Sequence, residues 1–252
     1  MEELLEVCSE LQIGDNIQFI LRFIGKGNIW INNTYEPEVT ALARIVVFSA
    51  LMETAPGQLK VIGYDSDLSG IFAPFASLTS GSSRQMELIR DERELEEQLN
   101  YLWQQVGIVQ NVIQGRADSL LEFRRITNRA VEGYTLVVLS LDMGMLKNEV
   151  RAQLATLMRV GPVYGFSFLI ISTTYMSLSG SNGKVIELTV DDLAPNISVL
   201  EVSGQTVELV RRRRSTKVNF LSLRRSSRTV KSLWSAFGMP GYPWSHLQKY
   251  MI

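Results

Sequence analysis

The stretch YTLVVLSLDMGMLKNEVRAQLATLMRVGPVYGFSFLIIS, residues 134–172, decides the fold of this 252-residue chain. Its two ends, 134–141 and 166–172, are apolar runs that are too short for helices and rich in strand-forming residues. Between them, residues 147–160 repeat apolar side chains at helical spacing. Strands that are apolar on both faces are typical of parallel sheets covered by helices on both sides, so this stretch predicts a strand–helix–strand unit of such a sheet.

The same alternation continues toward the N-terminus. We predict strands at 28–31 and 59–64 and helices at 37–52, 91–114 and 118–129, the last with Asp118 as N-cap. This order of strands and helices is the signature of an α/β doubly wound sheet. Beyond residue 177 the pattern predicts short hairpin or edge strands at 185–190, 197–202, 206–210 and 217–223. Residues 2–11 predict an amphipathic helix, with Leu4, Leu5, Val7, Cys8 and Leu11 on one side.

Composition excludes several classes of protein. With 46% apolar and 20% charged residues the chain is an ordinary folded protein, and no apolar run approaches the ~20 residues that span a bilayer. The acidic start does not resemble a secretory signal, and Cys8, the one cysteine, can form no internal disulfide. We therefore expect a reducing, cytoplasmic setting. His246, the one histidine, lies near the C-terminus, so we expect no histidine-based catalytic site and no metal centre.

The net charge of −1 is unevenly distributed. Residues 205–252 carry ten Lys or Arg against one acid, which leaves −10 on the rest of the chain. Such asymmetry indicates contact with a polyanion or an acidic protein surface, because the arginine fork matches phosphate and carboxylate geometry. The alternative is that these arginines are simply solvated charge. The candidate residues are Arg211, Arg212, Arg213, Arg214, Arg224, Arg225 and Arg228.

Ligands in open α/β sheets bind at the carboxyl ends of the strands. That rule selects the turn after Ile31 and the residues Asp65, Asp142, Thr173 and Thr174. Strand-terminal aspartates are also common as turn residues, and that interpretation stays open beside magnesium binding.

Four segments, in their order, resemble the FtsK/SpoIIIE/EssC group of DNA- and protein-translocating ATPases in the HerA-FtsK superfamily. They are LKVIGYDSDLSGIFAPFASL (59–78), NVIQGRADSLLEFRRI (111–126), YTLVVLSLDMGML (134–146) and RVGPVYGFSFLIISTTYM (159–176). The resemblance spans about residues 12–176. It implies a RecA-like, doubly wound, mostly parallel sheet with helices on both faces, to which the short C-terminal edge strands are added. We expect three parts: a lead-in over 1–27, the RecA-like core over 28–210, and a basic, aromatic-containing segment over 211–252.

The phosphate-binding loop implied by the resemblance is altered. Asn33 to Thr40 occupy the place of Gly-x-x-x-x-Gly-Lys-[Ser/Thr], but both glycines are missing and Val39 replaces the lysine. Glu36 and Glu38 would add negative charge beside a triphosphate, and two like charges ~4 Å apart repel by about 4 kcal/mol at an effective dielectric near 20. The altered loop therefore predicts that ATP is repelled.

The other two nucleotide motifs are altered as well. By the resemblance, Asp142 keeps the place of a metal ligand, whereas Met143 occupies the place of the water-activating glutamate. Thr174 and its neighbours keep hydroxyl groups without the family's Gln-Arg pair. These departures indicate a pseudo-ATPase that uses no cofactor.

The first hypothesis is thus a catalytically degenerate FtsK-like domain that acts as a binding and assembly module in a translocase, nucleic-acid-associated or secretion complex. It would associate with itself or with other ATPase domains, and with DNA or an acidic surface through its basic end. Two alternatives stay open. One is an active DNA translocase subunit that binds ATP and magnesium in a composite site, and the other is a structural adaptor that binds an acidic protein surface.

Overall fold

The computed structural model describes residues 23–32, 37–55, 57–66, 68–80, 84–128, 133–173, 175–179, 185–189, 197–203, 206–211 and 214–219. Backbone alone is described at 37–38, 175–179, 185–189, 203, 206–211 and 214–219. The helix predicted at 2–11 and the segment after residue 219 lie outside these ranges.

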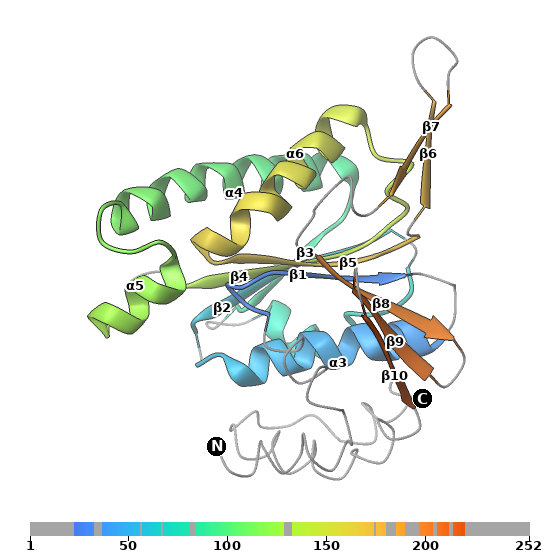
Figure 1. Ribbon diagram of the computed structural model, residues 1–252, viewed down its shortest axis with the longest axis horizontal. Helices are drawn as coiled ribbons and strands as arrows, with labels where there is room; N and C mark the ends of the chain where they lie inside the picture. The colour runs from blue at the N-terminus through green and yellow to red at the C-terminus, as the bar shows by residue number, and fades with distance from the viewer. Residues whose placement is uncertain are drawn as a thin grey trace.

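A single mixed sheet organises the described chain (Figure 1). Its strand order is β10-β9-β8-β1-β5-β4-β2-β3. The strands are β1 (Asn28–Asn32), β2 (Leu59–Asp65), β3 (Met86–Ile89), β4 (Tyr134–Ser140), β5 (Phe166–Ser172), β8 (Ile197–Ser203), β9 (Thr206–Arg211) and β10 (Arg214–Asn219). From β8 to β3 all neighbours are parallel, while β9 and β10 add an antiparallel edge. The predicted fold class, an α/β parallel sheet with antiparallel edge strands, is confirmed.

Helices cover both faces of this sheet (Figure 1). On one face lie α3 (Pro37–Glu53) and the 3-10 helix η1 (Ala73–Thr79), and on the other lie α4 (Glu92–Ile113) and α6 (Asn148–Val160). Two shorter helices, α5 (Leu120–Thr127) and η2 (Gly161–Tyr164), lead into β4 and β5. A separate antiparallel pair, β6 (Tyr175–Ser179) and β7 (Val185–Thr189), follows β5.

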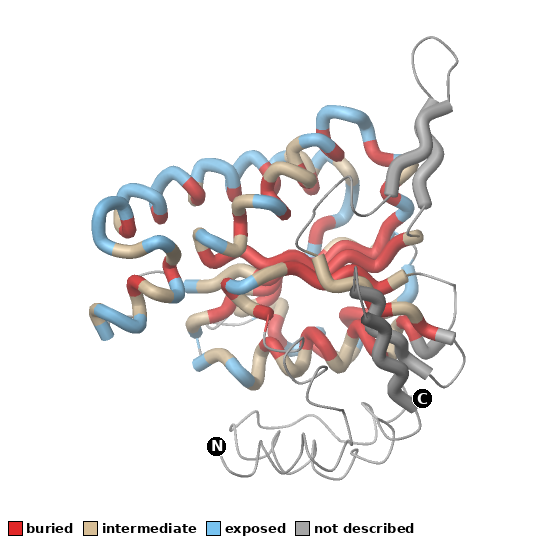
Figure 2. The backbone as a smooth tube through the Cα atoms, in the orientation of Figure 1, coloured by how far each residue is buried: buried red, intermediate tan, exposed pale blue. Residues whose placement is uncertain are grey.

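Alternation along the strands divides the core in two. Ile29 and Ile31 pack toward α3, whereas Trp30 between them packs toward α4 and α6, and all three are fully buried. The central strands form the most continuous buried region of the fold, as Figure 2 shows. Burial on both faces explains why these strands appear in the sequence as continuous apolar runs.

Three local expectations are corrected. The N-cap of α5 is Ser119, whose Oγ accepts from Glu122 N at 3.2 Å, and not Asp118. The strand β3 is not among the strands predicted from the sequence, because four residues give too short a pattern to recognise. The strand β8 is a hairpin strand, as predicted, since it pairs antiparallel with β9, but the edge alternative is wrong for it, because it also pairs in parallel with β1.

The division of the chain at residue 210 stays a prediction. The sheet continues across that position, because β10 pairs with β9 from Arg214 opposite Arg211 to Asn219 opposite Thr206.

Candidate functional site

The six parallel strands end at one edge of the sheet, here called the carboxyl edge, and begin at the opposite, amino edge. From β1 the chain passes through α3 to β2 on one side, whereas from β5 it continues to β8 on the other side. The order therefore reverses between β1 and β5, which is where open α/β sheets form a ligand crevice. Of the residues selected at strand ends, Asp65 ends β2 at this edge, and Asp142 and Thr173 follow the ends of β4 and β5 there.

The loop that would hold phosphate is described only in part. Asn33 and Glu36 lie outside the described residues, as does Thr174 after β5, and Glu38 is described by its backbone alone. Val39 belongs to the first turn of α3 and is 3% exposed, packed in the core with the other inward residues of that helix. Thr40 beside it is half-buried.

Asp65, at the end of β2, binds its own loop. Its Oδ1 accepts hydrogen bonds from the backbone N and the Oγ of Ser69, at 3.1 and 3.0 Å, and its Oδ2 accepts from Gly70 N at 2.9 Å. Ser66 anchors the start of the same loop to β4, donating from N and Oγ to the carbonyl oxygen of Ser140. Both carboxylate oxygens are thus already hydrogen-bonded, and Asp65 has the geometry of a turn residue.

Asp142 and Met143 follow β4 and point in different directions. Asp142 is exposed, and its Oδ1 accepts from Gly144 N at 2.8 Å. Met143 is fully buried in the core cluster beneath α4 and α6. The position that by resemblance would carry a water-activating acid therefore holds a side chain packed into the hydrophobic core.

Ser172 joins three strand ends at this edge. Its Oγ accepts from Met143 N at 3.2 Å, and its carbonyl oxygen accepts from the indole Nε1 of Trp30 at 3.0 Å. Both contacts are buried. These two hydrogen bonds fix the ends of β1, β4 and β5 relative to one another. They could not be predicted from the sequence, because no local pattern marks a contact between residues so far apart in the chain.

Arg151 is a second residue that sequence reasoning missed. It lies on the inner side of α6, is 5% exposed, and donates to the carbonyl oxygens of Met143, Gly144 and Leu146 and to Asn148 Oδ1. Burial lowers the pKa of its guanidinium below the ordinary value, and the nearby charge of Asp142 partly offsets this. One signal in the sequence could have revealed this residue: Arg151 stands at a helix position where the apolar periodicity predicts an inward-facing side chain. Its role is to hold the 142–147 loop closed over the core.

The carboxyl edge offers few ligands for a metal. Within the described ranges, no group of three or more His, Cys, Asp or Glu side chains is placed to hold an ion. Magnesium prefers several oxygen ligands. Here the oxygens of Asp65 are occupied by its own loop, so Asp142 is the main remaining carboxylate at the β2 and β4 ends.

The arginines predicted to bind a polyanion lie elsewhere. Arg211 ends β9, Arg214 begins β10, and the two are paired in register, whereas Arg212 and Arg213, which connect them in the sequence, lie outside the described residues. Because β9 runs antiparallel to β8, this connection is at the amino edge, opposite the candidate crevice. Arg224, Arg225 and Arg228 lie outside the described residues.

Comparisons by sequence find no relative: no protein-family model and no curated protein matches the chain. Solved structures do match in fold. The chain is similar to EssC (ATPases 2 and 3) from Geobacillus thermodenitrificans, with a TM-score of 0.60 and 13% identity over 86% of this chain and 45% of that one. It is also similar to Thermomonospora curvata EccC (ATPases 2 and 3) in complex with a signal sequence peptide, with a TM-score of 0.55 and 15% identity over 87% and 44%.

A third match is the pCW3 conjugation coupling protein TcpA in a monomer form with ATPγS. Its TM-score is 0.52, with 12% identity over 81% of this chain and 64% of that one. The chain thus spans less than two thirds of each of these three proteins. Within the described ranges, no helix is long and apolar enough to cross a membrane. Strand order, helix placement and these matches agree that the chain has the α/β fold of the ATPase units in the EssC and EccC structures.

Proposed function

We propose that this chain is a catalytically degenerate FtsK-like ATPase domain that serves as a binding and assembly module in a translocase or secretion complex. The observation that carries the proposal is the burial of Met143. A group that activates water must reach the substrate, but this side chain is fully buried beside the exposed Asp142.

Two further observations support a loss of nucleotide use. The carboxylate of Asp65 is bonded to its own loop, which leaves little capacity for magnesium. Val39, in the place of the phosphate-binding lysine, packs into the core. Both observations support a site that does not use magnesium–nucleotide, and Glu36 and Glu38 would add repulsion.

The retained sheet suits a role in assembly. The EssC and EccC structures are named for two ATPase units each, and this chain covers under half of either. A domain of the same fold without its own chemistry can still present the surfaces through which such units pack. We therefore propose other ATPase-type domains or further copies of this chain as partners.

The basic hairpin supplies a second binding element. Four consecutive arginines, from Arg211 to Arg214, span the connection of an edge hairpin at the amino edge. We propose that they contact DNA or an acidic protein surface. Phosphate contact predicts binding to a 30-base-pair duplex that weakens steeply between 50 and 200 mM salt and is lost when all four become Ala. Salt-independent retention of the duplex by that variant would contradict DNA contact.

ATP turnover and solution mass, measured together, test the proposal. We expect the purified chain to release no phosphate from Mg-ATP above the background set by heat-denatured protein. We also expect its mass to exceed that of one chain at low salt and to fall as salt screens its acidic and basic parts. Sustained turnover at the usual enzymatic rate of about 1 per second or more would overturn the proposal.

A further inference from the structure

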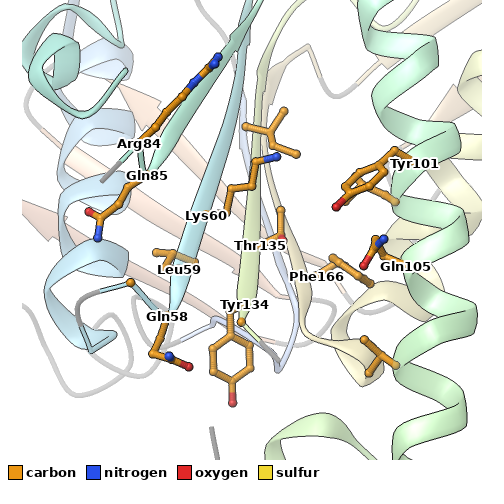
Figure 3. Close-up of a pocket in the computed structure, with 15 residues that line it drawn as sticks. Gln58, Leu59, Lys60, Arg84, Gln85, Tyr101, Gln105, Tyr134, Thr135 and Phe166 are labelled. Atoms are coloured by element: carbon orange, nitrogen blue, oxygen red, sulfur yellow. The ribbon is translucent and has the colours of Figure 1, made fainter. Parts of the chain in front are cut away.

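A groove opens at the amino edge, on the sheet face that α4 covers. Its volume is about 640 Å³, and it lies between α4 and the first residues of β2, β4 and β5. Figure 3 shows Tyr101 and Gln105 projecting from α4 toward the strands, and Lys60 extending from β2 toward Tyr101. The groove exists because β3 pairs with β2 only from Val61 onward, so the start of β2 has no strand on that side.

The floor of this groove is apolar and its walls are polar and cationic. Ile62, Leu102, Val109 and Phe166 line it and are all buried. Its charged lining residues among those described are Lys60 and Arg84, with no carboxylate in the lining.

The positive charge around the groove is only partly balanced. Lys60 Nζ lies 2.8 Å from Glu87 Oε2 and 5.6 Å from the centre of the Tyr101 ring. Arg84 is exposed, and Arg124 of α5 adds a third cation through its bond to Gln58. With Glu87 neutralising Lys60, two positive charges remain, so the groove favours a ligand that is apolar on one side and acidic on the other.

The chain itself contains such a ligand. Residues 1–11, MEELLEVCSEL, carry four glutamates and no Lys or Arg, and they predict an amphipathic helix with its apolar residues on one side. Amphipathic helices bind in grooves by their apolar side. The arginine hairpin also offers positive charge, but the apolar floor of the groove matches this segment better.

The described chain begins near the amino edge, with Phe23 packed in the core on the α3 side of the sheet, so a segment that precedes it reaches the groove by passing around this edge. Gly25 donates from N to Ser167 Oγ at 2.9 Å, and a Cβ at Gly25 would lie 2.8 Å from the ring of Tyr134, which lines the groove. Eleven residues lie between Leu11 and Phe23, and the twelve steps from one Cα to the next span at most about 40 Å. From β1 to β2 there are three strand intervals, roughly 15 Å. The segment can therefore reach the groove within one chain.

We propose that the groove is the docking site of the chain's own N-terminal segment, residues 1–11, held by its apolar side on the floor and by its glutamates near Lys60 and Arg84. Docking there places an acidic element over the amino edge.

Disulfide trapping in the full chain tests the position. Cys8 is the one cysteine of the chain, so Gln105→Cys creates one defined pair across the groove. The matched control is Gln104→Cys, the next residue of α4, which is exposed and not part of the groove. After mild oxidation, peptide mapping should find an intrachain link to Cys8 at least fivefold more often for Gln105→Cys than for Gln104→Cys. Equal yields, no link at either position, or links only between two chains would each overturn the proposal.

Charge substitution supplies a second measurement that needs no cross-link. Arg84→Glu with Gln105→Glu adds negative charge to the groove, while Lys147→Glu with Gln104→Glu makes the same change outside it. At 20 mM salt we expect the Cys8 thiol to react with Ellman's reagent about tenfold faster in the first variant and at the wild-type rate in the second. We also expect 0.5 M salt to accelerate the wild type. Equal rates for wild type and both variants, with melting curves unchanged, would overturn the proposal.

Discussion

Replacing Met143 by Glu tests whether the position that would carry a water-activating acid belongs to the core. The side chain is fully buried in the cluster beneath α4 and α6. Its burial contributes about 1.5–3 kcal/mol, which the substitution largely removes. A glutamic acid, with an ordinary pKa of about 4.3, must also stay neutral there, which adds about 3.7 kcal/mol at pH 7 at 1.36 kcal/mol per pH unit.

The expected loss at pH 7 is therefore about 5–7 kcal/mol, a large part of the usual stability of a single domain. The sign of the pH dependence follows, because a buried carboxyl group has a raised folded-state pKa. The part of the destabilisation that depends on pH is small near pH 4.3 and grows as pH rises toward that folded value, whereas the lost burial is the same at every pH. Urea unfolding followed by far-ultraviolet circular dichroism at pH 5 and pH 7 measures both effects.

Two further variants keep the reasoning testable should Met143→Glu fail to fold. Met143→Leu preserves volume and should change the free energy of unfolding by less than about 1.5 kcal/mol. Met143→Gln should destabilise at every pH without the pH-dependent part. If Met143→Glu lies within 1 kcal/mol of wild type at pH 7 and shows no pH dependence, the side chain faces water and the reasoning is refuted.

Three other substitutions probe the remaining contacts. Arg151→Met removes the donors that bind three backbone carbonyls, so we expect a loss of about 2–4 kcal/mol and faster amide exchange over 142–147, and unchanged exchange would contradict this. Asp65→Ala removes three hydrogen bonds of its loop and should lower the free energy of unfolding by about 1.5–3 kcal/mol, equally with and without 10 mM magnesium; a magnesium-dependent difference would indicate a metal site instead. The hydrogen bond from Lys60 lowers the pKa of Glu87, so this pair stabilises the fold above the ordinary pKa of glutamate and the effect fades as pH falls through the lowered value. Glu87→Gln should therefore flatten the pH dependence of stability between about pH 3 and 5 by less than about 1 kcal/mol, because the pair is partly exposed, and a steeper curve would contradict it.

The fold could be predicted where local pattern and tertiary burial agree. The predicted bounds of β4 and β5 agree with the structure to within one residue, because both faces of each strand are buried and every position is apolar or small. Helix α4 could be predicted equally well from the sequence, because its inward residues repeat at helical spacing. The structure shows Asp91 as its N-cap, where the side chain accepts a hydrogen bond from Glu94 N at 2.9 Å. Val39 lies in the helix predicted at 37–52 and is 3% exposed.

Long-range pairing could not be predicted in the same way. Nothing in residues 197–203 distinguishes an edge strand from one that lies between β1 and β9, because its register depends on partners more than 150 residues away. The same limit applied at the candidate site. Sequence order selected the carboxyl edge, yet the bonds of Ser172 and Arg151 join separate segments and leave no periodic signal. The amino-edge groove arises from the late start of β3, a strand that the sequence did not reveal.

Nucleotide affinity tests the central claim most directly. The account predicts that calorimetric titration of the full chain with ATP and with ADP, each with and without 5 mM magnesium, gives no binding heat up to 1 mM nucleotide. A saturable isotherm with a Kd below about 100 μM that strengthens on addition of magnesium would contradict it, because such binding requires the phosphate and metal contacts that this edge of the sheet is held to have lost.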